Sequence, residues 1–423
     1  MHAVVTLPGM DSLLPLSART DGGALSIGGV AATALAEEFG TPLVAYCAET
    51  LRSQARAYTG LDRHSLVVYG AKAFANVTLL QLFAAEGLGA DVSTLGELEF
   101  ALRAAVPPER IVFHGNNKSD AELTAAAAHD LLVVLDSGEE VDRAAAAGVR
   151  RALIRLTPGI EAETHRSIQT AHAQSKFGLD AGQALVAAAA AKERLKLEGV
   201  HVHVGSQLTH VDASLAAVDG LLDFCARARD ELDWVPSIVD LGGGLGVQHV
   251  HGEPVPDVTS FAGAVVSRFR ERWHEPARLI LEPGRSLVGR AGVTLYTVGA
   301  TKQSGGIHYA AVDGGMSDNP RPQLYAARYE PVLANRTGDR PEGIFRIAGK
   351  HCESGDVLVD AAQLPRPRRG DLLAIPATGA YTLAMASTYN SVPRPAAVLV
   401  DGVSARLIRR REGVGDLLAF EVA

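Results

Sequence analysis

The stretch that decides the fold is Ser65-Leu-Val-Val-Tyr-Gly-Ala-Lys-Ala-Phe-Ala75. Its apolar and β-branched residues predict a buried strand over Leu66–Gly70, which ends just before Lys72. Loss of water at the open end of such a strand would lower the pKa of a lysine from about 10.4 and allow the amine to form a Schiff base. Lys72 is therefore the candidate reactive group. A surface lysine that opens a helix over residues 76–86 would give the same local pattern.

Seven more apolar runs follow, separated by stretches rich in Ala, Leu, Glu and Arg. Such alternation of strands and helices requires parallel strand pairing with right-handed crossovers. Eight repeats match a closed (β/α)8 barrel of the TIM type, which typically needs about 250 residues. An open doubly wound sheet is the alternative. The eight predicted strands are residues 66–70, 89–92, 110–113, 131–135, 151–156, 199–204, 237–241 and 278–281.

Polar residues recur at the same end of nearly every predicted strand, which favours the barrel over the open sheet. In a barrel these residues converge on the C-terminal mouth, where barrel enzymes carry their chemistry. In chain order they are Lys72, Asp91, Ser93, His114, Asp136, Arg155, His203, Ser206, Asp240, Glu282 and Arg285.

The pattern changes after Gly289, where short strands are broken by Gly, Pro and Asp. This change predicts a mainly β second domain. The N-terminal residues are expected to join it because they precede the barrel and contain a short helix over 31–39 and a strand over 41–48. The sequence thus predicts a barrel domain over residues 45–288 and a mainly β domain formed by 1–44 and 289–423. The predicted strands of the second domain are residues 293–298, 308–312, 343–347, 372–375 and 397–400.

Composition narrows the class of protein. A net charge of −8 and a pI of about 6.0 argue against a nucleic-acid partner and favour a small-molecule substrate. Cys47, Cys225 and Cys352 have neither CxxC nor zinc-ligand spacing, so no disulfide framework and no metal site is expected. Neither a signal sequence nor a run of about 18 apolar residues is visible, so we expect a soluble cytoplasmic protein that binds no membrane.

Three features of the predicted mouth are the parts needed to hold pyridoxal 5′-phosphate. Lys72 offers an amine, and the glycines of Gly242-Gly243-Gly244 expose backbone N–H groups that suit a phosphate. Glu282 would protonate a pyridine nitrogen and so support an electron sink. Each feature also has a plainer explanation, such as tight packing for the glycines and an ion pair with Arg285 for Glu282.

Two residues near the end of the sixth strand complete this site. His203 would offer a flat ring to stack on the cofactor and Ser206 a hydroxyl for its phosphate, although a buried histidine with an ordinary hydrogen bond is the default. His201 is predicted to point to the opposite side of the strand and to be structural.

These motifs resemble the fold-type III, alanine racemase-like family of pyridoxal-phosphate-dependent decarboxylases, most closely its members that act on meso-2,6-diaminopimelate. The resemblance runs from about Thr41 to Leu418. The motifs that carry it are Ala71-Lys72-Ala73, His203-Val-Gly-Ser-Gln207, Asp240-Leu-Gly-Gly-Gly244, Glu282-Pro-Gly-Arg285, Asp313-Gly-Gly-Met-Ser-Asp-Asn-Pro-Arg-Pro322, Cys352-Glu-Ser-Gly-Asp356, Gly379-Ala-Tyr381 and Met385-Ala-Ser-Thr-Tyr-Asn390.

The resemblance implies decarboxylation of meso-2,6-diaminopimelate to L-lysine and CO2, the last step of lysine biosynthesis, by a homodimer with shared active sites. It implies catalytic roles for Lys72, His203, Glu282 and Cys352, with Cys352 as the proton donor. The implied cofactor-binding residues are Lys72, His203, Ser206, Gly242, Gly243, Gly244, Glu282, Gly284, Arg285 and Tyr381. The implied substrate-binding residues are Arg285, Arg321, Tyr325, Glu353 and Tyr381. Cys352 and Glu353 would come from the other subunit.

Other functions remain open at this point. The substrate would be ornithine, lysine, arginine or an analogue of diaminopimelate in one alternative, but a substrate without a second carboxylate has no use for Arg321. A homologue that only binds a partner is a second alternative, against which the joint presence of Lys72, Glu282 and Cys352 argues. Two departures from the family's common wording, Phe74 after Ala73 and Leu95 before Gly96, concern only local loop shape.

Overall fold

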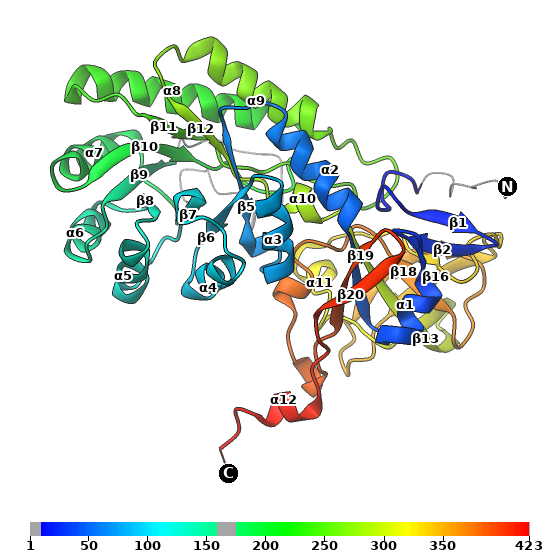
Figure 1. Cartoon of the computed structure of the whole chain (residues 1–423). Helices are drawn as coiled ribbons and strands as arrows, with labels where there is room; N and C mark the ends of the chain where they lie inside the picture. Colours follow the sequence, from blue (N-terminus) through cyan, green and yellow to red (C-terminus); the bar gives the residue numbers. More distant parts are fainter. Residues whose placement is uncertain (1–9, 158, 160–174, 423) are drawn as a thin grey trace. The chain divides into compact units, whose positions relative to one another are not determined.

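The computed structural model describes residues 10–157, 159 and 175–422 (Figure 1). The chain forms two compact units. One consists of Gln54–Gly246 and Val255–Ser286, and the other of Met1–Ser53, Val247–Pro254 and Leu287–Ala423. Among the described residues, no helix is both long and apolar enough to cross a membrane.

The first unit is a closed barrel of eight parallel strands in the order β10-β11-β12-β5-β6-β7-β8-β9, as the sequence predicts. Small shifts of the strand ends are the only differences from the predicted ranges, the largest being at β10, which starts at Lys196 rather than at residue 199. The strands are β5 (Leu66–Gly70), β6 (Gly89–Val92), β7 (Ile111–Phe113), β8 (Leu132–Leu135), β9 (Arg151–Leu156), β10 (Lys196–Val202), β11 (Ile238–Asp240) and β12 (Arg278–Leu281).

The barrel is filled by a cluster of buried aliphatic side chains from its strands, among them Val68, Val134 and Ile280. Where one strand supplies two of these side chains, the two residues are separated by one position, because alternate residues of a strand face the same side. Most of the next positions on the same faces are polar, namely His114, Asp136, Arg155, Asp240 and Glu282.

Local sequence signals set where the surrounding helices begin. Six helices start directly after an Asn, Thr, Ser or Asp whose side chain accepts a hydrogen bond from a backbone N–H three residues on, which satisfies one of the free donors of the first turn. These helices are α3 (Val77–Ala85), α4 (Leu95–Arg103), α5 (Asp120–Ala128), α6 (Gly138–Ala146), α7 (Ala181–Arg194) and α9 (Val258–Arg272). The chain also forms α2 (Ala48–Thr59), α8 (Asp212–Leu232) and α10 (Arg285–Val288).

The second unit is mainly β, as predicted. Its large sheet has the path β17-β16-β14-β13-β4-β19-β20, and β15 and β18 pair beside that path. Two buried apolar clusters pack in this unit, one around Leu295 and one around Ile347. The strands of the sheet are β4 (Leu43–Cys47), β13 (Gly292–Ser304), β14 (Ile307–Val312), β15 (Val332–Leu333), β16 (Gly343–Ala348), β17 (Val357–Leu364), β18 (Leu372–Ile375), β19 (Ala396–Asp401) and β20 (Ser404–Arg409).

The N-terminal part of the chain contributes to the second unit. The strand predicted over residues 41–48 is β4, which pairs with β13 on one side and β19 on the other. The predicted helix over 31–39 is α1 (Ala32–Phe39), and it follows a small sheet of β1 (Arg19–Asp21), β2 (Ala24–Ile27) and β3 (Val30–Ala31). The remaining helices of this unit are α11 (Arg321–Tyr325) and α12 (Val414–Leu418).

Candidate active site

A glycine loop closes the end of β11. The backbone N–H of Gly242 donates to Oδ1 of Asp240 at 2.9 Å, and the backbone N–H of Glu282 donates to the carbonyl oxygen of Gly242 at 2.8 Å. A Cβ at Gly243 would lie 2.2 Å from the carbonyl oxygen of Glu282, and Gly242 has a φ of +63°. Only glycine fits these two positions, because one needs close backbone approach and the other a left-handed conformation.

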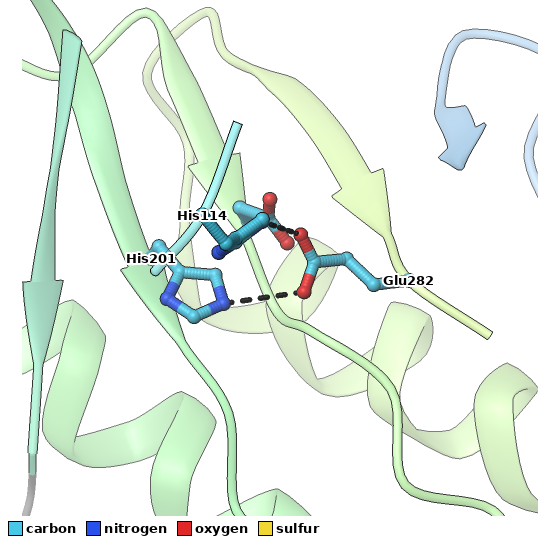
Figure 2. Close-up of side chains that lie close together, drawn as sticks. His114, His201 and Glu282 are labelled. Atoms are coloured by element: carbon cyan, nitrogen blue, oxygen red, sulfur yellow. Dashed lines mark hydrogen bonds and ion pairs between the residues drawn. The ribbon is translucent and has the colours of Figure 1, made fainter. Parts of the chain in front are cut away.

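Glu282 follows β12 and is buried, with a hydrogen-bond partner on each carboxylate oxygen (Figure 2). Nε2 of His114 lies 2.6 Å from Oε1, and Nε2 of His201 lies 3.3 Å from Oε2. His114 follows β7 and His201 lies within β10, so strands from different parts of the barrel supply the two partners. Glu282 is therefore fixed in the barrel mouth by contacts on both of its oxygens.

The two imidazoles determine which carboxyl group of this cluster is ionised. Although burial opposes ionisation of Glu282, the two histidines hold its pKa well below the usual range. Burial and the neighbouring Glu282 raise the pKa of Asp240 well above the usual range. Glu282 is thus the carboxylate and Asp240 carries the proton. Burial lowers the pKa of His201 to about 3, so its ring is neutral and donates through Nε2.

Lys72 lies in the turn after β5, and β5 pairs with β12. Nζ of Lys72 is 3.4 Å from Oδ2 of the buried Asp91, and the side chain is 48% exposed. The predicted desolvation of this lysine is wrong, because the turn carries the side chain into an accessible position beside a carboxylate. The amine is placed where a small molecule can reach it.

The loop after β10 brings His203 and Ser206 to the mouth. The backbone N–H of Gly243 donates to Nδ1 of His203 at 3.2 Å, and burial lowers the pKa of His203 well below the usual range, so the ring is neutral. Ser206 Oγ accepts from Nε and Nη2 of the buried Arg285 at 3.3 and 3.1 Å. Gly284 precedes Arg285. A Cβ added at Gly70 would lie 3.5 Å from the Cα atom of Gly284.

In the second unit, Arg321 begins α11 and is buried. Its Nη1 donates to the hydroxyl of Tyr329 at 2.6 Å and to Nε2 of His249 at 2.8 Å. The rings of His249 and Tyr329 pack edge to face with centroids 5.4 Å apart. Tyr325 ends the same helix, and its hydroxyl lies 3.9 Å from Sδ of Met385.

The motif that contains Cys352 is joined to the glycine-rich motif after β14. Oδ1 of the buried Asp356 accepts from the backbone N–H of Met316 at 2.7 Å, while Oδ2 of Asp356 accepts from the backbone N–H and Nδ1 of His351 at 2.9 and 2.8 Å. Cys352 is exposed, and its backbone N–H donates to Oδ1 of Asn390 at 2.9 Å. The loop is rigidly anchored while the thiol remains accessible.

Glu353 and Tyr381 lie in the same unit. Oε2 of Glu353 accepts from the hydroxyl of Tyr389 at 3.2 Å, and the Tyr389 ring stacks on His351 with centroids 5.7 Å apart. Tyr381 has a φ of +57°, a left-handed conformation that non-glycine residues adopt at a cost and that is concentrated at functional sites.

Sequence reasoning misplaced one residue of the site. The prediction that His201 points to the side of the strand opposite His203 is wrong, because Nε2 of His201 lies 3.3 Å from Oε2 of Glu282, in the cluster at the barrel mouth. Sequence reasoning also placed His114 and Asp240 at the mouth without giving either a role. The signal for all three was available, since residues 112 and 114, 199 and 201, and 238 and 240 fall on the same face of their strands. Arg321 has two hydrogen-bond partners, His249 and Tyr329, and no comparable signal in the sequence pointed to either of them.

Comparison with known proteins agrees with this fold. A family model described as "Pyridoxal-dependent decarboxylase, pyridoxal binding domain" matches residues 48–289. That range contains every strand of the barrel, so the class of protein is a pyridoxal-dependent decarboxylase built on a parallel barrel. Pyridoxal 5′-phosphate is accordingly the cofactor.

Relatives narrow the class further. A diaminopimelate decarboxylase of Mycobacterium tuberculosis is 43% identical over 96% of this chain and 96% of the relative, and one of Halalkalibacterium halodurans is 41% identical over 96% and 97%. The crystal structure of a diaminopimelate decarboxylase from M. jannaschii in complex with L-lysine superposes with a TM-score of 0.90 at 32% identity, over 96% of this chain and 98% of that one. The chain belongs to the family of the diaminopimelate decarboxylases.

Proposed function

We propose that the protein decarboxylates meso-2,6-diaminopimelate to L-lysine and CO2, the last step of lysine biosynthesis. The observation that carries this proposal is the placement of the accessible amine of Lys72 and the ionised carboxylate of Glu282 after the paired strands β5 and β12. The lysine-bound relative supports the choice of substrate, since lysine is the product of this reaction.

The residues at the barrel mouth fit pyridoxal phosphate. The cofactor supplies an electron sink for the carbon that loses CO2. Lys72 would bind the cofactor covalently through Nζ, and Glu282 would hold a proton on the ring nitrogen. His203, whose neutral ring is held by Gly243, would stack on the cofactor. The glycine loop leaves no room for a Cβ and exposes backbone N–H groups, which suit a phosphate. We assign the phosphate to Ser206, Gly242, Gly243, Gly244, Gly284, Arg285 and Tyr381.

The second unit would supply the substrate contacts. Arg321 has the planar fork for a bidentate contact with the distal carboxylate, and Glu353 would pair with the distal ammonium. Tyr325 and Tyr381 of the same unit, together with Arg285 of the first unit, would complete the substrate site. After CO2 leaves, Cys352 would give its thiol proton to the same carbon and become a thiolate. The accessibility of Cys352 on an anchored loop supports that role.

The proposal includes an assembly and a domain division. Residues 45–288 would form the cofactor-binding domain, and residues 1–44 and 289–423 the mainly β domain, in line with the family match over 48–289. Two chains would form a homodimer in which Cys352 and Glu353 reach the site of the partner subunit. The protein would work in the cytoplasm, where its three free cysteines stay reduced.

A decarboxylation assay over a panel of amino acids tests the function. We expect CO2 release from meso-2,6-diaminopimelate in the presence of pyridoxal phosphate and far less from L-lysine, L-ornithine and L-arginine. The matched control is Lys72→Ala, which should release none. Preference for a substrate with a single carboxylate would contradict the proposal. Absence of any turnover together with tight cofactor binding would favour a non-catalytic homologue.

Hybrid dimers test the shared site. Lys72→Ala and Cys352→Ala lie in different units of the chain and should each be nearly inactive as homodimers. If sites are shared, a heterodimer of the two variants has one site in which both residues are intact, so activity should return on mixing. Verified heterodimers without recovered activity would show that each chain completes its own site.

A further inference from the structure

The carboxylate of Glu282 is hydrogen-bonded by two histidines that lie outside the sequence motifs of the site. Glu282, His114 and His201 are each at least nine-tenths buried, and each imidazole contacts a different carboxylate oxygen through Nε2 (Figure 2). The rings of the two histidines meet edge to face with centroids 4.8 Å apart, so each restrains the other. This arrangement fixes the plane of the carboxylate as well as its position.

Burial alone would leave Glu282 protonated, because an isolated carboxylate is costly away from water. Two imidazole nitrogens, one on each carboxylate oxygen, offset that cost through direct hydrogen bonds. Asp240 lies in the same cluster, since one carboxylate oxygen or ring nitrogen from each of the four residues lies within 4.8 Å of the others. Since Asp240 has only a backbone N–H as its hydrogen-bond donor among the described contacts, the proton of this acidic pair belongs on Asp240.

We infer that His114 and His201 are positioning residues that keep Glu282 ionised and aimed at the ring nitrogen of the cofactor. The inference rests on the proposed role of Glu282 and adds the residues through which that role is exerted. Neither histidine needs to touch the cofactor, because each acts through one oxygen of Glu282. A carboxylate oxygen has two lone pairs, so each can accept from a histidine and still accept a proton-bearing ring nitrogen.

A metal ion is the competing explanation for two histidines and two carboxylates in one cluster. Ligands bound to Zn²⁺ at about 2.0–2.1 Å in a tetrahedron stand roughly 3.3 Å apart. The 2.6 Å between Nε2 of His114 and Oε1 of Glu282 is shorter than that separation and is a hydrogen-bond distance. The geometry therefore favours direct hydrogen bonds over shared coordination.

Binding of two cofactor forms to the apoenzyme tests the inference without using activity. Pyridoxal phosphate has a ring nitrogen for Glu282, whereas 1-deazapyridoxal phosphate has a carbon in its place and is otherwise matched. The wild type should bind pyridoxal phosphate more tightly, by about tenfold to a hundredfold, the range for a hydrogen bond to a charged group. His114→Leu and His201→Leu should lose most of this preference by weakening only the binding of pyridoxal phosphate.

Conservative variants provide the matched control. His114→Gln and His201→Gln keep an N–H donor at the distance of Nε2 and should keep most of the preference. Thermal melting of each apoprotein shows that the variant folds. Should a leucine variant not fold, the asparagine variant replaces it, because its amide is polar but too short to reach Glu282.

The outcomes separate the inference from the proposed function. Leucine variants that lose affinity equally for both cofactor forms would show that the histidines serve the shape of the site, and the inference would be overturned. Leucine variants that keep the wild-type preference would overturn it as well. A wild type that binds both forms equally would overturn the assignment of Glu282 itself, and the inference with it.

Discussion

Arg321 is held by Tyr329, whose hydroxyl accepts a hydrogen bond from Nη1 of the guanidinium over 2.6 Å. The edge-to-face contact of Tyr329 with His249, which accepts from the same nitrogen, fixes the ring in turn. The long side chain of Arg321 is thereby ordered before any ligand arrives. A preorganised guanidinium loses less conformational entropy when it binds a carboxylate.

Arg321→Ala should lower kcat/KM for meso-2,6-diaminopimelate. The loss of transition-state stabilisation should be on the order of 2–5 kcal/mol, the cost of removing one partner of a buried charge pair. The residual decarboxylation of L-lysine, which has no distal carboxylate, should fall much less. Steady-state kinetics on both substrates measure the difference. Tyr329→Phe is the matched variant and should cost roughly 1 kcal/mol, since it removes one hydrogen bond but leaves the charge. Equal losses on the two substrates would place Arg321 outside substrate recognition.

Lys72→Ala should abolish both activity and the covalent attachment of the cofactor while leaving thermal stability nearly unchanged, because the side chain is 48% exposed. Borohydride reduction of the wild type followed by peptide mapping should label Lys72. Lys118 is an internal control, because it is buried and held by Glu140 at 3.0 Å. A label on Lys118 or on any other lysine would refute the assignment.

Cys352→Ala should lower kcat strongly and leave KM within a few-fold, because a proton donor acts after the substrate is bound. Initial-rate kinetics together with solvent isotope effects check this. Asn390→Ala is a useful companion, since it removes the side chain that anchors the backbone of Cys352 and should produce a smaller loss of the same kind. A raised KM with unchanged kcat in Cys352→Ala would make this residue a binding group.

Gly243→Ala should destabilise the protein by about 1–3 kcal/mol and weaken binding of pyridoxal phosphate, because the added Cβ would lie 2.2 Å from the carbonyl oxygen of Glu282. Gly138→Ala is the control. That glycine opens α6 with no atom within 4 Å of an added Cβ, so its stability should change by less than about 0.5 kcal/mol. Melting of the apoprotein and cofactor titration measure both effects, and a harmless Gly243→Ala would show that the loop is free to move.

Asp318 should make stability depend on pH. Burial raises the pKa of Asp318 to about 7, whereas an unfolded aspartate titrates near 3.9. As pH rises from about 4 to about 7 the unfolded chain releases this proton while the folded chain keeps it. The folded state is therefore progressively disfavoured, by an amount on the order of 4 kcal/mol above pH 7.

Asp318→Asn removes that titration and preserves the acceptor for the backbone N–H of Gly315. The melting temperature of the variant should rise relative to wild type between pH 4 and pH 7, and the difference should level off at higher pH. A constant difference across this range would mean that Asp318 is not the titrating group.

Periodicity predicted the alternation of strands and helices, because each strand is a short apolar run and each helix lies between two of them, and the polar residues at the strand ends favoured the barrel over an open sheet. The sequence also placed Lys72, the glycine loop and Glu282 at the ends of strands that the structure brings into one barrel. The accessibility of Lys72 was missed because it depends on the turn Ala71–Ala73 rather than on the strand before it. The contacts of Arg321 could not be predicted, since Tyr329 lies eight residues away and His249 comes from a distant part of the chain.

The long β13 shows a similar limit. Residues 293–298 are predicted as a strand, but the strand continues to Ser304 through exposed residues, most of them polar, that extend the pairing with β14. Strand pairing alone supports that extension, and a pattern of burial cannot reveal it. Roles of individual residues in catalysis remain predictions for the same reason, because they depend on chemistry that neither periodicity nor burial encodes.

The position of β4 has a consequence for how the chain folds as it leaves the ribosome. β4 is an interior strand of its sheet, between β13 and β19, yet it is synthesised before the barrel, whereas β19 is among the last strands to emerge. The barrel strands can pair with one another as soon as they appear, but Leu43 must wait for Ala396 before its ladder is complete. During that interval the backbone N–H and C=O groups of β4 that will pair with β19 are free. The nascent protein therefore carries an aggregation-prone strand edge near its N-terminus until synthesis is nearly finished.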